Sequence, residues 1–359
     1  MSISVDCRMI DSSGIGAYLR GCLPYFLETR HNFLLIGDGR RLSEFADRAN
    51  VDILDCPLKP FSVTETFFPP TRLYKAINKT NLYYSPYFNV PGRIGVPVYT
   101  TIHDIIFPDM PELCSRAGLA ARMWFYRRAF SLSKTLFTVS RFSKSRIEHY
   151  LGDSKPVIVT YSAAPVPVRH DLRLPDEKQR LGTPKEPYIL FVGNIKKHKG
   201  LSCLLEAFSR IRGARLNYKL IVAGEKNNFR TSERATADKY ASNSDGVLFT
   251  GLVSGIELEI LFRNAALLVQ PSLYEGFGLP PLEALLRGVP ALISDIEVFK
   301  EIYGEYGVTY FRAGSSDSLE EKLLELLGSG MPPRVELSDD LRSKYTFEKT
   351  ALEIMRNFD

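Results

Sequence analysis

Short apolar runs alternate with longer amphipathic stretches along the whole chain. Many runs are continuously apolar and rich in β-branched and aromatic residues, which is typical of parallel strands with helices on both faces. The runs predict strands at 2–9, 33–37, 51–56, 82–84, 98–103, 135–139, 157–161, 188–193, 218–224, 247–250, 265–270, 290–294 and 308–311. Helices are predicted between them, for example over 17–28, 116–132, 201–211, 279–287 and 319–327. This alternation predicts an α/β fold of doubly wound domains.

A proline-rich break divides the pattern into two halves of similar size. Five prolines lie between residues 163 and 187, together with charged residues and little apolar periodicity. A chain of 359 residues is also longer than one compact core usually spans. We therefore predict one domain over 1–165, a linker over 166–186 and a second domain over 187–343, two Rossmann-like domains that face each other across a cleft.

The composition is that of an ordinary globular protein, with 45% hydrophobic and 24% charged residues. It excludes a disordered chain, a fibrous repeat and a disulfide scaffold. Five scattered cysteines form no C-x-x-C pair, which favours reduced thiols in the cytoplasm. Asp6 and Arg8 interrupt the N-terminal apolar run, so we expect no secretory signal. The sequence contains no apolar stretch of about 18 residues, so we expect no membrane span.

The charge is unevenly distributed between the halves. Residues 1–170 carry 21 Lys and Arg against 14 Asp and Glu, whereas the remainder carries 25 against 27. This asymmetry indicates that the first half faces an anionic partner such as lipid headgroups, a diphosphate or nucleic acid. An uneven surface without function explains it equally well.

The strongest motif runs from Ser272 to Ala284, directly after a predicted strand. Gly276 and Gly278 allow a tight turn with exposed N–H groups, and the two prolines that follow suit a first helical turn. The start of such a helix is an anion site, because its unpaired amides and its dipole both attract phosphate. Glu275 and Glu283 flank this site and suit the hydroxyls beside a diphosphate. A capped surface helix with solvated glutamates is the structural alternative.

This segment resembles the retaining glycosyltransferases of family 4, which have the GT-B fold. Glu275 and Glu283 match the family's Glu-x7-Glu signature, and 275–295 matches its pattern nearly throughout. The resemblance implies that Glu275 lies near the donor sugar and that Glu283 binds the nucleotide ribose. It assigns acceptor binding to the first domain, donor binding to the second, and a crossing back to the first domain to a last helix at 344–359. The turn residues Gly276, Phe277, Gly278 and Leu279 are donor-binding by the same resemblance.

A second motif, 191–200, crowds three lysines and a histidine into one strand-to-helix turn. A lysine there can offset the negative charge that develops on a departing diphosphate. The resemblance makes Lys199 the phosphate-binding lysine and places Asn194 at the donor, where many relatives have an arginine. Lys196 or Lys197 is a candidate substitute for that arginine, and a solvated basic loop is the alternative.

Two motifs of the first half complete the predicted site. His103 follows a predicted strand, where it could bind a sugar hydroxyl or a phosphate oxygen, although a lone histidine is more often structural. The resemblance favours contact with the donor sugar, which makes His103 a catalytic candidate with Glu275 and Lys199. Gly14 and Gly16 fit the family's first glycine loop, close to the diphosphate; a plain turn before a helix is the alternative.

Residues 116–134 predict a contact with an anionic membrane. This stretch carries Arg116, Arg122, Arg127, Arg128 and Lys134 without an acidic residue, and aromatic residues interleave with them. Such a helix is typical of a membrane-surface element. The aromatic residues could equally belong to the core.

Together these features predict a cytoplasmic enzyme, peripheral on the inner face of the cytoplasmic membrane. It would transfer a hexose, with mannose favoured, from a nucleotide diphosphate sugar to a saccharide or lipid-linked saccharide in polysaccharide biosynthesis. The resemblance implies retention of the anomeric configuration. No Asp-x-Asp triplet occurs, so we expect neither a metal nor another cofactor, and we expect no nucleic-acid partner. A sugar-nucleotide epimerase, a phosphorylase and a catalytically silent nucleotide-sugar-binding protein remain alternatives.

Overall fold

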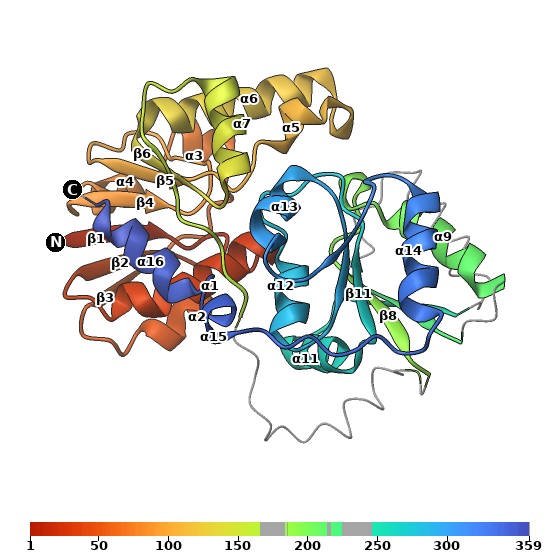
Figure 1. Cartoon of the computed structure of the whole chain (residues 1–359). Coiled ribbons are helices and arrows are strands. Elements are labelled where there is room, and N and C mark those ends of the chain that lie inside the picture. The colour runs from red at the N-terminus through yellow and green to blue at the C-terminus, as the bar shows by residue number, and fades with distance from the viewer. Residues whose placement is uncertain (166–183, 185, 214–216, 225–245, 359) are drawn as a thin grey trace. The chain divides into compact units, whose positions relative to one another are not determined.

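A computed structural model describes residues 1–165, 184, 186–213, 217–224 and 246–358. The chain divides into two compact units (Figure 1). Unit 1 consists of Met1–Pro165 and Tyr345–Asp359, and unit 2 of Val166–Lys344. Most of the predicted linker, 166–186, lies outside the described residues.

Unit 1 is built on a parallel sheet, which in the described part of the chain has seven strands in the order β3-β2-β1-β4-β5-β6-β7. The strand order reverses between β1 and β4, so that the loops after these two central strands diverge and leave room at their carboxyl ends. The strands are β1 (Ser2–Asp6), β2 (Asn32–Gly37), β3 (Val51–Asp55), β4 (Leu82–Ser85), β5 (Val98–Thr101), β6 (Ser133–Thr138) and β7 (Val157–Val159).

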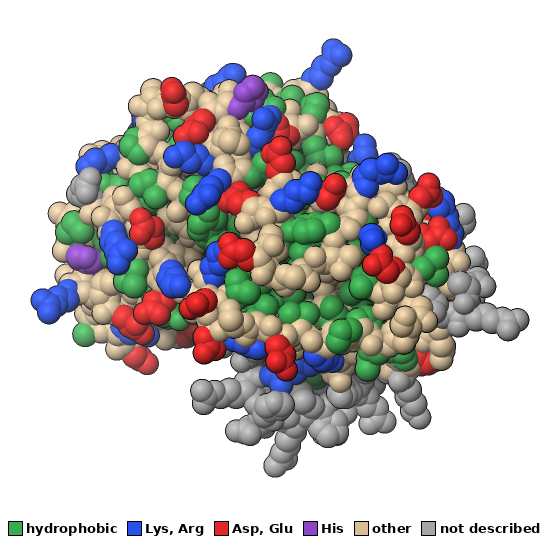
Figure 2. Space-filling model, in the orientation of Figure 1, with side chains coloured by type: hydrophobic (Ala, Val, Ile, Leu, Met, Phe, Trp, Pro, Cys, Tyr) green, Lys and Arg blue, Asp and Glu red, His purple; other side chains and the backbone are tan. Residues whose placement is uncertain are grey.

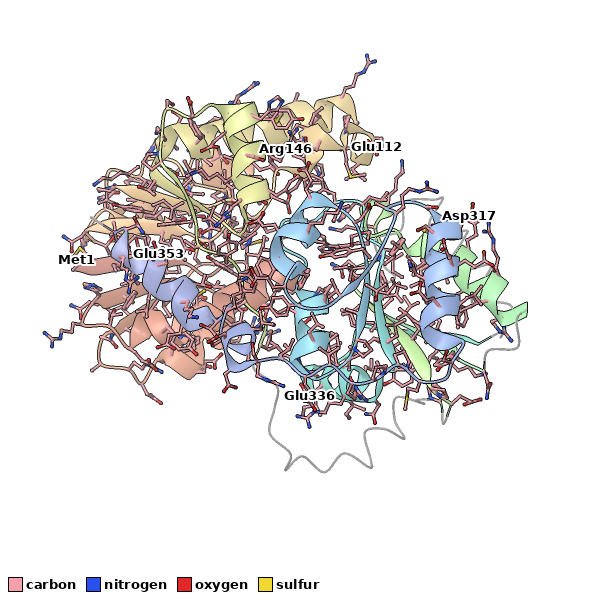
Figure 3. All side chains as sticks on the ribbon, viewed as in Figure 1. Met1, Glu112, Arg146, Asp317, Glu336 and Glu353 are labelled. Atoms are coloured by element: carbon pink, nitrogen blue, oxygen red, sulfur yellow. The ribbon has the colours of Figure 1, made fainter. Side chains whose placement is uncertain are left out.

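Helices cover both faces of this sheet (Figure 1). The Ser140 hydroxyl accepts a hydrogen bond from the Ser143 amide at the start of α7, as expected for a helix cap. Arg146 of α7 pairs with Asp109 of α5 and so ties these helices together at the end of unit 1 labelled in Figure 3. The helices are α1 (Ser13–Leu27), α2 (Gly39–Leu42), η1 (Ser43–Phe45), α3 (Val63–Phe67), α4 (Thr71–Ile77), α5 (Ile106–Asp109), η2 (Pro111–Leu113), α6 (Arg116–Leu132), α7 (Arg141–Leu151) and α16 (Phe347–Arg356).

Unit 2 repeats the architecture with a parallel sheet of six described strands, in the order β10-β9-β8-β11-β12-β13. Its strand order reverses between β8 and β11. The strands are β8 (Tyr188–Val192), β9 (Lys219–Ala223), β10 (Val247–Gly251), β11 (Leu267–Gln270), β12 (Ala291–Ser294) and β13 (Thr309–Phe311). The helices are η3 (Lys197–Lys199), α9 (Leu201–Gly213), α11 (Gly255–Asn264), α12 (Leu279–Leu286), α13 (Glu297–Tyr303), α14 (Ser316–Leu327) and α15 (Asp339–Arg342). The predicted α/β fold of doubly wound domains is confirmed.

The C-terminal helix α16 packs in unit 1. The Phe347 ring lies so close to Gly21 of α1 that a Cβ on that glycine would overlap it. Phe358 packs its ring against Tyr84 and Tyr99 in the middle of the sheet, at centroid distances of 5.6 and 4.9 Å. The last fifteen residues therefore complete the core of the unit that begins the chain.

The structure separates the aromatic residues of the basic helix α6. Tyr126 and Phe130 are buried in a core cluster with Ile102 and Leu136, whereas Trp124 is 42% exposed. The sequence left open whether these aromatic residues face the core or the surface, and both occur. No helix in the described part of the chain is both long and apolar enough to cross a bilayer. Figure 2 shows basic and acidic side chains interspersed over the face it presents.

Candidate functional site

The candidate site of unit 2 lies where its strand order reverses. Strands β8 and β11 pair in parallel, so the loops that follow them leave the same edge of the sheet side by side. Lys199 lies in the loop after β8, at the end of η3, and Glu275 lies in the loop after β11. The sheet thus brings together two residues that are 76 positions apart in the sequence.

Lys199 and Glu275 form an ion pair. The Lys199 ammonium lies 2.7 Å from each carboxylate oxygen of Glu275, and the Glu275 side chain is only 8% exposed. The Ser272 hydroxyl donates to the same carboxylate at 2.8 Å, and Gln270 donates to Ser272 at 3.0 Å. Because two polar groups bind this carboxylate and Gln270 orients one of them, it has a fixed position. The sequence alone did not assign a role to Gln270, which ends the strand that leads to Glu275, or to Ser272, which follows that strand.

The start of α12 lies next to this ion pair in the sequence. Gly278 has the left-handed φ of 81°, and a Cβ there would overlap the Phe299 ring. Only glycine combines this conformation with this close approach at low energetic cost. Pro280 lies in the first turn of α12, where a missing N–H loses no helical hydrogen bond. Because Pro280 and Pro281 carry no N–H, this helix start offers an anion the Leu279 amide and the positive end of the helix dipole.

Glu283 lies one turn inside α12 and is largely buried. Its carboxylate accepts no hydrogen bond from the described residues, because Arg287 turns its guanidinium to Glu259 and to the Glu283 main-chain carbonyl. The pKa of Glu283 is raised to about 7, and burial is the main cause. Of the charged neighbours, Arg287 acts to lower this pKa and Glu259 acts to raise it. A buried carboxylate without a partner is suited to accept hydrogen bonds from hydroxyls of a ligand.

The loop after β8 is held against its neighbours by main-chain contacts. The Leu273 amide donates to the His198 carbonyl at 2.7 Å, and Gly200, with a φ of 68°, lies against the Pro271 carbonyl. Burial and the nearby Lys199 lower the pKa of His198 to about 4, against the opposing effect of Glu275. His198 is therefore neutral at physiological pH, and Lys199 is the basic group of this loop that contacts Glu275.

Lys196 and Lys197 line a separate cavity of about 260 Å³. Leu201, Cys203 and Gly314 also line it, whereas Lys199 and Glu275 do not. Asn194, where many relatives of the predicted family have an arginine, is half-buried in the same loop. Which residue takes the place of that arginine stays a prediction.

His103 lies in unit 1, just after β5. Its Nε2 lies 2.9 Å from the Pro86 carbonyl oxygen, which can only accept, so Nε2 carries the proton and Nδ1 is left as an acceptor. Burial lowers the pKa of His103 to about 4, although the hydrogen bond to Pro86 acts in the opposite direction. The ring also packs edge-on against Tyr18 at 4.7 Å. His103 is thus a neutral, fixed hydrogen-bond acceptor.

The two glycines of the first loop differ in their surroundings. A Cβ at Gly16 would overlap the Ile10 carbonyl, whereas a Cβ at Gly14 would meet nothing within 4 Å. Gly16 is therefore required by packing within the loop, and packing does not explain Gly14. Both lie in unit 1 with His103, whereas the other predicted site residues lie in unit 2. Within the described ranges, no group of three or more His, Cys, Asp or Glu side chains is placed to hold a metal ion.

Comparison with known proteins gives related sequences for most of the chain. Residues 175–344 match the family of glycosyl transferases group 1. The O-antigen chain mannosyltransferase B of Escherichia coli is 29% identical over 240 residues, which cover 64% of this chain and 61% of that protein. The O-antigen chain mannosyltransferase RfbU of Salmonella typhimurium is 28% identical over 255 residues, which cover 69% and 65%. The match thus spans less than two thirds of the length of either relative.

Solved structures show the same fold over the whole chain. HepE of Anabaena in complex with UDP-glucose superposes with a TM-score of 0.69 at 15% identity, covering 100% of this chain and 96% of that one. Sucrose-phosphate synthase of Thermosynechococcus elongatus has a TM-score of 0.69 at 15% identity, covering 100% and 95%. The fold is the GT-B fold, as the sequence resemblance predicted, and residues 175–344 are similar to the glycosyl transferases group 1.

Proposed function

We propose that this protein is a glycosyltransferase that moves a hexose from a nucleotide diphosphate sugar to a saccharide acceptor, with retention of the anomeric configuration. The observation that carries the proposal is the Lys199–Glu275 ion pair, in the loop that leads into the start of α12 and to the unpaired Glu283 carboxylate. It offers one cation, the Leu279 amide and the positive end of the α12 dipole for a diphosphate, and two carboxylates for hydroxyls on either side of it.

In this proposal the diphosphate leaving group is stabilised by positive charge. As the bond from the sugar to the diphosphate breaks, negative charge develops on the phosphate oxygens. Lys199 and the positive end of the α12 dipole would meet that charge without reorganising, because both are held by the fold. Glu275 keeps the Lys199 ammonium in place and can accept from a hydroxyl of the hexose, while Glu283 can accept from the ribose.

The acceptor hydroxyl would attack the anomeric carbon on the face that the diphosphate leaves, and its proton would pass to the departing diphosphate oxygen. His103 is suited to orient the hexose, because its Nδ1 can accept a hydrogen bond from a sugar hydroxyl. It is not suited to act as a general acid near neutral pH, since its pKa is about 4.

Mannose is the proposed hexose, and an O-antigen-type polysaccharide, built on a lipid-linked saccharide, the proposed product. The support is that the two relatives described above are O-antigen mannosyltransferases. We take GDP-mannose as the first donor to test and UDP-glucose as the second.

The test begins with donor binding to the purified protein. GDP-mannose, UDP-glucose, GDP and UDP are each added in a thermal unfolding series, where a ligand that binds the folded state raises Tm, and at equal concentration a tighter ligand raises it more. We expect either the guanine or the uracil compounds to stabilise the protein. Lys199→Ala should lower the affinity for the stabilising compounds at least tenfold, because a charged hydrogen bond to the diphosphate is lost. No stabilisation by any of the four compounds would contradict the proposal.

The same donor is then incubated with octyl α-mannoside, and the product is followed by NMR. We expect a new glycosidic bond with the donor's anomeric configuration, and a loss of about 10²–10³-fold in kcat for Glu275→Gln. An isomerised donor without acceptor would instead identify an epimerase, and a sugar phosphate formed with inorganic phosphate would identify a phosphorylase. Binding without any conversion would favour the silent binding protein.

A further inference from the structure

An exposed aromatic patch lies on unit 1, where side chains of α3 and α6 meet. Both helices are labelled in Figure 1. We define the α3–α6 patch as Val63, Phe67, Phe68 and Trp124. Their exposed fractions are 68%, 54%, 69% and 42%, and the Phe67 and Trp124 rings lie 5.6 Å apart. Monomeric proteins usually avoid such grouping of large apolar side chains on the surface unless it binds something.

The short helix α3 is held by an ion pair beneath it. Glu65 faces inward from the middle of α3 and pairs with Arg8, and both side chains are at most 2% exposed. Arg8 also binds Asp6, at the carboxyl end of β1, through Nε at 2.9 Å. Because Glu65 points into the core, the residues on either side of it, Val63 and Phe67, are left on the surface. The patch is therefore presented by a firmly anchored element.

The segments that carry the patch are strongly basic. Residues 57–72 and 115–134 contain seven Lys and Arg and a single acidic residue, which is the buried Glu65. Arg128 lies over the Trp124 ring at 5.8 Å, and Arg127 beside it on α6 is exposed. Lys59 and Arg72, which flank α3 in the sequence, are exposed as well. An apolar centre on two segments whose exposed charged side chains are all basic is complementary to an anionic lipid surface.

We propose that the α3–α6 patch docks the protein on an anionic bilayer. The aromatic side chains enter the interface between headgroups and acyl chains, a depth that Trp and Phe favour, while the exposed Arg127 contacts lipid phosphates. The surface extends the membrane element predicted at 116–134: α6 supplies the arginines and one aromatic side chain, and α3 supplies the remaining apolar contacts. Docking does not require the transfer reaction, so it is tested without substrate.

The experiment is co-flotation of the full-length protein with vesicles of phosphatidylcholine, alone or with 30% phosphatidylglycerol. We expect binding to the anionic vesicles and at least fivefold weaker binding to the neutral ones, with a further loss on raising the salt concentration. Phe67→Ser and Phe68→Ser should each weaken binding about tenfold, because less apolar surface is transferred from water into the bilayer. Arg127→Gln should weaken it about fivefold on anionic vesicles only.

Matched controls distinguish binding through the α3–α6 patch from nonspecific adsorption to vesicles. Met331→Ser removes an apolar side chain of unit 2 that is 66% exposed, and Arg40→Gln removes an arginine whose side chain is 92% exposed; neither should change flotation. Equal binding to both vesicle types, or unchanged flotation of the Phe67 and Phe68 variants, would overturn the proposal. So would a dimer in solution that these variants dissociate, since a second copy would then cover the patch. Donor-induced stabilisation should survive in all five variants, so failure here leaves the proposed transfer reaction standing.

Discussion

Glu283 is the candidate-site residue whose charge changes near neutral pH. Burial raises its pKa to about 7, whereas burial lowers the pKa values of His103 and His198 to about 4. The two histidines are therefore neutral between pH 6 and 8, while Glu283 loses its proton in that interval. A protonated carboxyl group cannot accept two hydroxyl hydrogen bonds as a carboxylate does, so ligand binding should report this ionisation.

We predict that donor affinity rises about tenfold between pH 6 and pH 8, because the ionised fraction of Glu283 rises from about one tenth to about nine tenths for a pKa of about 7. The measurement is calorimetric titration with GDP-mannose, whose phosphates are both esterified and do not titrate in this range. Glu283→Gln should remove the pH dependence and bind weakly throughout. A pH dependence that persists in Glu283→Gln would assign it to another group.

The same ionisation affects stability with the opposite sign. The pKa of Glu283 is raised above its ordinary value of 4.5, so the folded state holds its proton more tightly than the unfolded state. We predict that this group's contribution to the free energy of unfolding falls as the pH rises from about 4.5 to about 7 and is constant above. The check is urea unfolding over this range: the difference in unfolding free energy between wild type and Glu283→Gln should shift in favour of Gln as the pH rises.

His103 should act by holding the hexose rather than by transferring a proton. Its Nε2 proton is committed to the Pro86 carbonyl, and Nδ1 is the atom left to accept from a hydroxyl. We predict that His103→Ala lowers kcat/KM for the hexose donor about tenfold or more, since one hydrogen bond to the sugar is lost. The pH profile of the remaining activity between 6 and 8 should match that of the wild type. If the pH profile of His103→Ala lost or shifted one of the transitions seen in the wild type, His103 would instead transfer a proton.

At the scale of the element, the start of α12 depends on Gly278. Its φ of 81° and its contact with Phe299 leave no room for a side chain. We predict that Gly278→Ala costs about 1–3 kcal/mol of stability and weakens donor binding more than tenfold, because the start of α12 is displaced. Gly255→Ala at the first position of α11 is the matched control, since a Cβ there meets nothing within 4 Å. Equal effects of the two substitutions on donor binding would argue against an anion site at α12.

Long apolar runs made the strands predictable. Each predicted strand overlaps an observed one, and the five predicted helices are likewise present, α6 at its predicted bounds. The short helix α3 was not predicted, because five residues carry too little periodicity and its position depends on the Glu65–Arg8 ion pair. The contact of Lys199 with Glu275 was not predictable as a distance, since it depends on β8 and β11 being neighbours in the sheet. Motif spacing found Glu275 and Glu283, but it could not find Ser272, which supports Glu275 from the neighbouring loop position.

At the scale of the molecule, unit 1 is not continuous in the sequence. Unit 1 contains both ends of the chain, and the Thr350 hydroxyl on α16 donates to the Tyr161 carbonyl at 2.8 Å. Ile354 and Phe358 are buried in the same core as strands β4 and β5. Unit 2 is thus an insertion between two parts of unit 1, and its candidate anion site uses no residue after Lys344.

This arrangement predicts that a destabilising substitution in α16 lowers the stability of unit 1 and leaves that of unit 2 unchanged. Phe358→Ala removes a ring that contacts Tyr84, Tyr99 and Phe137, and should cost unit 1 about 3–5 kcal/mol, because the cavity left in the sheet core cannot fill. Hydrogen exchange followed residue by residue should show faster opening of β4 and β5, while β8 and β11 keep their protection. Leu352→Ala, at a residue that is 40% exposed on the same helix, is the control and should leave both units nearly unchanged. Loss of protection in β8 and β11 to the same degree would mean that the two units unfold as one.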